Sequence, residues 1–204
     1  MTNPSSPARS PSKGHGRGST RSTVTGEFVG LPYSADVEEP YLIWDFKRRD
    51  LERRPKDVFH SLLNRVSEYS SAKLYAAVEI GVPTYVVILL ADALGHKPAW
   101  AMDLVGVSES TFRRKDEASE PLPEVAGHRA MGFLRIVATL KRLLQESGDP
   151  ESMASFDLEA WVSDWVQEPL PEFGGKTPAD MLRNPEGQRA VEELLERMRG
   201  GIVA

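Results

Sequence analysis

The chain has 204 residues, of which 40% are hydrophobic and 27% are charged, proportions that suit a globular protein with one or two small cores. Its 25 lysine and arginine residues against 30 aspartate and glutamate residues give a net charge of −5. This balance excludes a uniformly basic surface for nucleic acid, but it leaves room for a local basic face. The sequence has no cysteine, which excludes disulfides, cysteine-ligated zinc, iron–sulfur clusters and thiol catalysis.

The apolar segments of the chain are short. The longest, Val82 to Leu94, contains Pro83 and Asp92 and falls short of the ~20 residues that a membrane helix needs. The amino terminus has no apolar segment of the secretory type. We therefore expect a soluble, cytoplasmic protein that makes no membrane contact.

Residues 1–26 are rich in Ser, Thr, Pro and Gly and contain four cations but no acidic residue. Such a composition cannot bury enough apolar surface to offset the entropy lost on ordering, so we expect a disordered basic tail. It is either an inert extension or an arm that follows nucleic-acid phosphates.

Residues 27–55 form an N-terminal extension whose structure the sequence leaves open. The run Tyr41-Leu42-Ile43-Trp44 is short enough for a strand, an extended arm packed on the body or the start of a helix. The mixed charges of residues 47–54 are typical of a solvated surface.

From Lys56 onward the apolar residues recur at helical spacing, so the pattern predicts an all-α fold. One helical region runs from Lys56 to Gly81. The further helices of this part are expected at Thr84 to Leu94, Lys97 to Leu104, Ser108 to Lys115 and Pro123 to Ser147.

The Pro123–Ser147 helix has an unusually wide apolar face, which includes Phe133, Leu134 and Ile136. So broad a face indicates burial on more than one side. Two explanations remain: the helix carries the contact of a homodimer, or it is central to a single larger α-helical core.

The C-terminal part carries clear helix-start signals. A helix is expected from Phe156 to Val166, and Thr177-Pro178-Ala179-Asp180 has the cap, proline and acid of a capping box. Asn184-Pro185 repeats the cap and proline before a last amphipathic helix, which includes Met198 on its apolar face and which Gly200-Gly201 ends.

No enzyme constellation emerges, and we expect no catalytic residue, no metal site and no cofactor. The four histidines, at positions 15, 60, 96 and 128, lie far apart and belong to no recognisable metal motif. The glycine-rich run at 14–18 neither follows a strand nor opens a helix, so it does not form a phosphate loop.

Residues 97–115 have the pattern of a helix-turn-helix. Gly106 supplies the positive φ of the turn, Ser108 caps the second helix, and Ala101, Val107 and Phe112 are placed to hold the two helices together. The side chains left for DNA contact are Ser108, Ser110, Thr111, Arg113, Arg114 and Lys115. The alternative is a helical hairpin of an α-helical core with an exposed basic end.

Several motifs then occur in the order of a known family. They are Gly81-Val82-Pro83, Val107 to Arg114, Pro169 to Leu182 and Pro185 to Gly200. Together they resemble the Xre/MbcA/ParS antitoxins, and the most specific part is Gly174-Gly175-Lys176-Thr177-Pro178 between Trp165 and Glu186-Gly187. The resemblance implies an Xre-like helix-turn-helix domain at 56–147 and a toxin-binding domain at 148–204.

The resemblance also implies the function. It predicts an antitoxin of a type II toxin–antitoxin pair that silences a RES-domain, NAD⁺-consuming toxin and regulates its own operon by binding operator DNA, as a homodimer within a hetero-oligomeric complex. The alternative is a free-standing transcription regulator of the Xre type.

The toxin contact is expected on residues 174–182 and the outer face of the last helix. The residues assigned to it are Gly174, Gly175, Lys176, Thr177, Pro178, Met181, Leu182, Arg197, Arg199, Ile202 and Val203. We expect residues 200–204 to enter the active-site cleft of the toxin, with Ile202 and Val203 buried there. The alternative is that the docked surface inhibits by itself and the end of the chain contributes nothing.

Overall fold

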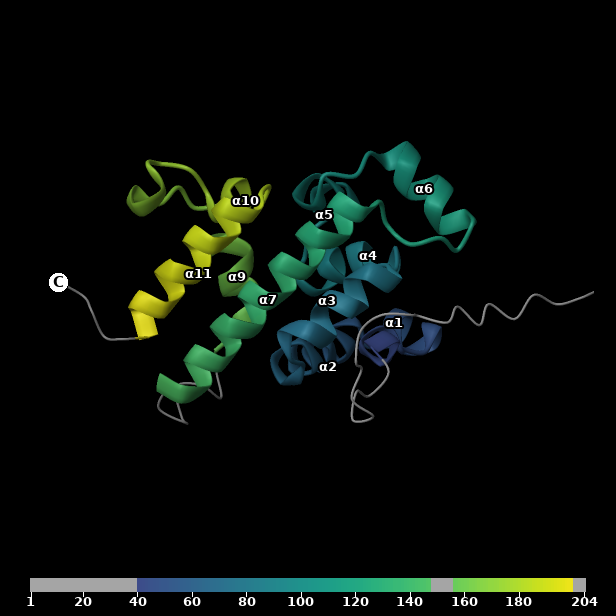
Figure 1. Ribbon diagram of the computed structural model, residues 1–204, viewed down its shortest axis with the longest axis horizontal. Coiled ribbons are helices and arrows are strands. Elements are labelled where there is room, and N and C mark those ends of the chain that lie inside the picture. Colours follow the sequence, from purple (N-terminus) through teal and green to yellow (C-terminus); the bar gives the residue numbers. More distant parts are fainter. Residues whose placement is uncertain (1–39, 148–155, 200–204) are drawn as a thin grey trace, which may run out of the picture. The chain divides into compact units, whose positions relative to one another are not determined.

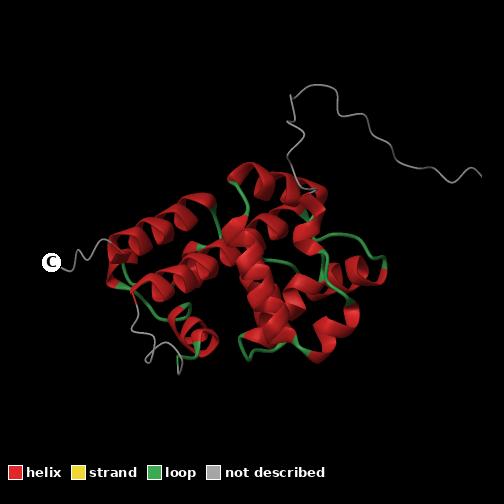
Figure 2. Cartoon of the chain, turned by 90° about the horizontal axis from the view of Figure 1, so that it is seen from below, coloured by secondary structure: helices red, strands yellow, loops and turns green. Residues whose placement is uncertain are grey.

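The computed structural model describes residues 40–147 and 156–199, and these residues form helices (Figures 1 and 2). The all-α prediction is confirmed: the described residues contain no β-strand, only an isolated antiparallel bridge between Leu170 and Lys176. Residues 1–26, residues 27–39 of the extension and residues 200–204 lie outside the described part of the chain.

The described residues form ten α-helical and two 3-10 segments. In chain order they are η1 (Pro40–Trp44, 3-10), α1 (Arg48–Arg53), α2 (Pro55–Glu68), α3 (Ser71–Ile80), α4 (Tyr85–Ala93), α5 (Pro98–Val105), α6 (Glu109–Glu117), α7 (Glu124–Ser147), α9 (Leu158–Trp165), η2 (Pro171–Phe173, 3-10), α10 (Pro178–Met181) and α11 (Pro185–Arg199).

The Tyr41–Trp44 run is a turn of 3-10 helix rather than a strand. It is anchored because Ile43 and Trp44 are buried and the Trp44 indole Nε1 donates to the Ala77 carbonyl of α3 at 3.1 Å. The Tyr85 hydroxyl donates back to the Trp44 carbonyl at 2.7 Å. The charged run that follows forms α1.

The helical region after Lys56 is divided into two helices. Helix α2 ends at Glu68, and Ser70 starts α3 by accepting a hydrogen bond from the Lys73 backbone N–H at 3.3 Å. The apolar periodicity correctly predicted the buried face of α2, which includes Val58, Leu62, Leu63 and Val66. It did not show the break, which lies at Tyr69 and Ser70 between the two helices.

Helix α7 is the central element of the described residues, and it packs against α2, α3, α5 and α11. Its buried side chains are Ala126, Ala130, Met131, Phe133, Leu134, Ile136, Val137, Ala138 and Leu140. A single chain therefore covers the wide apolar face. This favours the explanation that α7 is central to one larger core, and a dimer is not needed to account for the face.

The described residues include no single helix that is both long and apolar enough to cross a membrane. The pair α3 and α4 meets the length and composition criteria only when both helices are taken together across a bend of 119°.

Candidate functional site

The pair α5 and α6 has the local geometry of a helix-turn-helix. Gly106 ends α5 in the left-handed conformation, with φ 73° and ψ 40°, which only glycine adopts at little cost. Ser108 caps α6 by accepting from the Thr111 N–H at 3.2 Å. Ala101, Val107 and Phe112 are buried, and Phe112 is the one buried residue of α6. The predicted start, turn and apolar anchor are all present.

The polar side of α6 presents the predicted DNA contacts, but its cations have acidic neighbours. Ser108, Ser110, Arg113 and Arg114 are exposed, and Thr111 and Lys115 are half-buried. Arg113 pairs with Glu109 at 2.8 Å, and Lys115 pairs with Glu120 at 2.8 Å. The hydrogen bond from Lys115, together with the charges of Lys115 and Arg114, lowers the pKa of the Glu120 carboxyl.

The charge of this segment is therefore balanced locally. Residues 108–120 hold three cations, at 113, 114 and 115, against four carboxylates, at 109, 116, 117 and 120, for a net charge of −1. A phosphate that meets Arg113 or Lys115 must compete with a carboxylate already bound to it.

In the C-terminal region, a tightly closed loop joins α9 to α10. The Leu170 N–H donates to the Lys176 carbonyl and the Gly175 N–H donates to the Leu170 carbonyl, both at 3.0 Å. Gly174 and Gly175 have positive φ, and Phe173 is buried. The loop thus holds Gly174, Gly175 and Lys176 outward on a buried aromatic anchor.

The capping box predicted after this loop is present. The Asp180 N–H donates to the Thr177 hydroxyl at 3.1 Å, and the Thr177 N–H donates to the Asp180 carboxylate at 3.4 Å. The Thr177 hydroxyl also donates to that carboxylate at 3.0 Å. These side-chain and backbone hydrogen bonds lower the pKa of Asp180 below its ordinary value.

Helices α10 and α11 approach each other so closely that only glycine fits between them. A Cβ on Gly187 would overlap the Met181 carbonyl oxygen and lie 2.6 Å from the Met181 carbonyl carbon. The Asn184 side chain caps α11 by accepting from the Gly187 N–H at 2.9 Å. Close packing therefore explains Gly187 of the Glu186-Gly187 pair that the sequence singled out, and Glu186 beside it is exposed.

The predicted toxin contacts fall into three groups. Gly174, Gly175, Lys176, Arg197 and Arg199 are exposed, and Thr177 and Met181 are half-buried. Pro178 and Leu182 are buried, so their side chains are part of the core beneath the surface. Ile202 and Val203 lie outside the described residues.

Helix α11 turns one side to the body and leaves the other free. Val191, Leu194 and Leu195 are buried as the periodicity predicts, whereas Met198, expected on the same apolar face, is 53% exposed. The Arg199 guanidinium lies 3.4 Å from the Glu146 carboxylate near the end of α7.

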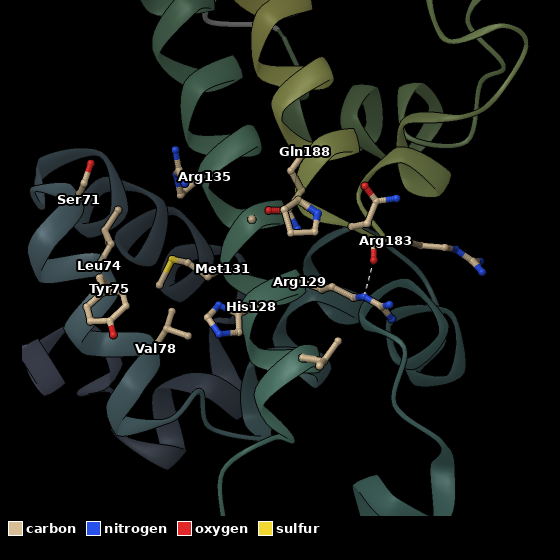
Figure 3. A pocket seen from close by; sticks show the side chains of 14 residues that line it. Ser71, Leu74, Tyr75, Val78, His128, Arg129, Met131, Arg135, Arg183 and Gln188 are labelled. Atoms are coloured by element: carbon tan, nitrogen blue, oxygen red, sulfur yellow. Dashed lines mark hydrogen bonds between the residues drawn. The ribbon is translucent and has the colours of Figure 1, made fainter.

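A polar joint, formed by Asp103, Arg129 and Arg183, links the helix-turn-helix to the C-terminal region. Arg183 pairs with Asp103 of α5 at 3.2 Å. The Arg129 Nε of α7 donates to the Arg183 carbonyl at 2.9 Å (Figure 3). The Arg129 guanidinium also covers Gly106, since a Cβ there would collide with it. Sequence reasoning missed this joint.

Two of the three histidines in the described residues, His60 and His96, make structural contacts. His60 of α2 lies 2.6 Å from the Glu159 carboxylate of α9. His96 stacks on Trp100, with ring centroids 4.0 Å apart, and hydrogen-bonds to the Ser163 hydroxyl at 2.8 Å. Across residues 40–147 and 156–199, no three His, Asp or Glu side chains gather as a metal site requires.

Comparison with known proteins addresses the C-terminal region. Residues 153–201 match the family model described as the antitoxin Xre/MbcA/ParS C-terminal toxin-binding domain. A curated relative, the Prs ADP-ribosylating antitoxin of Sphingobium sp. (strain YBL2), is 31% identical over 102 residues. These residues are 50% of this chain and 62% of that protein, so the match spans less than two thirds of the relative.

Proposed function

We propose that this chain, a member of the Xre/MbcA/ParS antitoxin family through residues 153–201, is an antitoxin that binds and neutralises a toxin protein. The observation that carries this proposal is the C-terminal region: a toxin-binding domain by sequence, whose loop at 174–176 and outer α11 face are exposed on a tightly packed support. This chain acts by binding, and the enzymatic chemistry belongs to its partner.

The toxin that we propose is of the RES type and consumes NAD⁺. The name of the Sphingobium relative refers to ADP-ribosylation. Transfer of ADP-ribose and hydrolysis of NAD⁺ both break the bond between nicotinamide and ribose. The relative therefore supports a partner that acts on this bond.

The proposed docking surface comprises the exposed residues Gly174, Gly175, Lys176, Arg197 and Arg199, with Thr177 and Met181 at its edge. Pro178 and Leu182 support it from beneath. The proposal that residues 200–204 enter the toxin cleft concerns residues beyond Arg199, where α11 ends.

We further propose that the α5–α6 pair binds operator DNA and that a homodimer, within a hetero-oligomeric complex with the toxin, presents it twice. One short recognition helix offers too small an interface for specific binding, and two half-sites about 34 Å apart are the usual remedy. The acidic neighbours of Arg113 and Lys115 predict weak phosphate binding by a single copy.

The decisive experiment co-expresses the full chain with the toxin of the neighbouring reading frame and purifies the tagged chain. We expect a stable complex, and we expect the NAD⁺ loss caused by the toxin alone to be suppressed. A neighbouring protein that neither binds nor consumes NAD⁺ would contradict the proposal. It would favour the second candidate, a free-standing Xre-type regulator, which the α5–α6 geometry supports.

The contribution of the end of the chain is tested by truncation after Arg199. Toxin binding and NAD⁺ consumption are then measured separately. Binding without full suppression is expected if residues 200–204 reach the cleft. Complete suppression by the truncated chain would show that the docked surface is sufficient.

A further inference from the structure

A groove of about 520 Å³ lies where α3, α7 and the start of α11 meet (Figure 3). Leu74 of α3 and Met131 of α7 are buried and form part of its lining. Arg183 and Gln188 line the side that belongs to the family-matched residues 153–201. The groove is therefore continuous with the toxin-binding domain, but it lies outside the docking surface proposed above.

The walls of the groove expose large apolar side chains. Tyr75 on α3 is 64% exposed, and Val125 near the start of α7 is 61% exposed. The described residues expose six large hydrophobic side chains in all, and these two are the most exposed of them. Two apolar side chains that line one groove and stay this exposed indicate a surface that a partner covers.

The charge of the groove has one sign. Its lining includes Arg129, Arg135 and Arg183 together with His128, and no carboxylate, in a chain that has an excess of acidic residues. Arg135 and Arg183 each pair with a carboxylate outside the lining, and the His128 ring lies 3.8 Å from the Glu124 carboxylate. Within the described part of the chain, Arg129 makes no ion pair and donates only to a carbonyl.

We propose that this groove is a second docking site for the toxin partner, and that it takes an amphipathic segment with carboxylates on its polar side. The apolar side of such a segment would cover Tyr75, Val125 and Met131, and its carboxylates would meet the arginines. This inference rests on the proposed antitoxin function. It adds that the toxin contacts α3 and α7 as well as residues 153–201.

The consequence is that one partner would bridge the helix-turn-helix domain and the C-terminal region. A segment in the groove would also touch Arg129, whose guanidinium covers the Gly106 turn.

The test uses two variants of the full chain, Tyr75→Glu and Val125→Glu. Both positions are exposed, and an acid at the second residue of α7 suits the helix dipole, so the fold is expected to persist. The matched control is Ile80→Glu, which alters a residue of α3 that is 54% exposed but does not line the groove. Thermal unfolding of each variant checks that the fold persists.

The probe is the purified toxin of the neighbouring reading frame, titrated against each variant. Each groove variant should bind about tenfold more weakly or worse, because it places a carboxylate against an acidic segment, and the control should bind like the wild type. Hydrogen exchange should show toxin-dependent protection of residues 71–78 in the wild type and in the Ile80→Glu control, but not in the two groove variants.

The outcomes separate the two proposals. If the wild type binds the toxin and both groove variants bind equally well, the groove proposal is overturned while the antitoxin proposal stands. If the wild type does not bind the toxin, both are overturned. If Tyr75→Glu instead converts a toxin-free oligomer into a monomer by light scattering, the occupant is a second copy of this chain and the toxin assignment is overturned.

Discussion

The α5–α6 pair and the C-terminal region begin their helices with the same devices but are held to the body in different ways. Gly106 and Gly174 both turn the chain with a positive φ, and Ser108 and Thr177 both cap the next helix. Helix α6, however, buries a single residue, whereas α11 buries four. Caps and glycines thus fix where a helix begins, and burial decides how firmly it is attached.

This difference in burial suits the two tasks proposed above. A helix with one buried anchor leaves nearly all its side chains for contact with a long polar ligand such as DNA. A helix that is buried along one side and free along the other offers a rigid surface to a protein. The predictions below test this difference, from the largest expected effect to the smallest.

The largest effect is expected at Phe112, the single buried anchor of α6. Phe112→Ala should lower the free energy of unfolding by ~3–5 kcal/mol, or detach α6 locally, because a buried ring is lost. Urea unfolding combined with hydrogen exchange of α6 measures both. Toxin binding should be retained, and Phe112→Leu should cost under ~1.5 kcal/mol. If α6 of the Phe112→Ala variant is as protected from hydrogen exchange as in the wild type, then other contacts hold the helix in place.

The next effect is expected at Gly187, where α10 and α11 touch. Gly187→Ala should destabilise the C-terminal region by ~1–3 kcal/mol, because its Cβ meets the Met181 backbone, which cannot rotate away. The affinity for the toxin should fall together with this stability, while the protection of α6 from hydrogen exchange should stay unchanged.

Gly132→Ala is the matched control, since both glycines lie inside helices and gain similar helix propensity. Its Cβ would meet the Gln188 side chain, 2.5 Å from Cδ, and that side chain can move. Equal losses of stability in the two variants would contradict the close-packing explanation.

The caps give a smaller pair of effects. Ser108→Ala and Thr177→Ala should each cost ~1 kcal/mol, since each removes the acceptor for an orphan helix N–H. Thr177→Ala should cost more, because the Thr177 hydroxyl donates to the charged Asp180 carboxylate, whereas the Ser108 hydroxyl donates to the neutral Thr111 hydroxyl at 2.9 Å. Thermal unfolding of both single variants provides the comparison. A larger loss at Ser108 would mean that the capping box adds nothing to the simple cap.

The sequence predicted what short-range signals encode. Ser108, Thr177 and Asn184 each mark a helix start that needs only the next three residues, and Gly106 marks a turn that needs a left-handed residue. These signals act within one turn of helix, so they can be recognised without knowledge of the rest of the chain.

Features that depend on distant neighbours could not be predicted. Leu182 follows the four-residue helix α10 and is buried, and so short a helix has no periodicity from which its buried side can be inferred. The joint between Asp103 and Arg183 spans 80 positions, and the groove depends on how α3, α7 and α11 pack. The proposed toxin surface depends further on a second molecule.

The smallest effect is expected at the joint between the two regions. In a double-mutant cycle of Asp103→Ala and Arg183→Ala, the coupling should be about 0.2–1 kcal/mol, because both side chains are largely solvated at 78% and 51% exposure. Raising the salt concentration should reduce this coupling further.

The matched control is a double-mutant cycle of Arg135 and Glu192, whose side chains form an ion pair at 2.9 Å that joins α7 to α11 without touching α5. The affinity for DNA is then measured with and without the toxin. If substitutions at Asp103 and Arg183 alter the effect of the toxin on this affinity, and those at Arg135 and Glu192 do not, then the Asp103–Arg183 pair carries communication between the regions. If neither cycle does, the two regions act independently and the joint only fixes their packing.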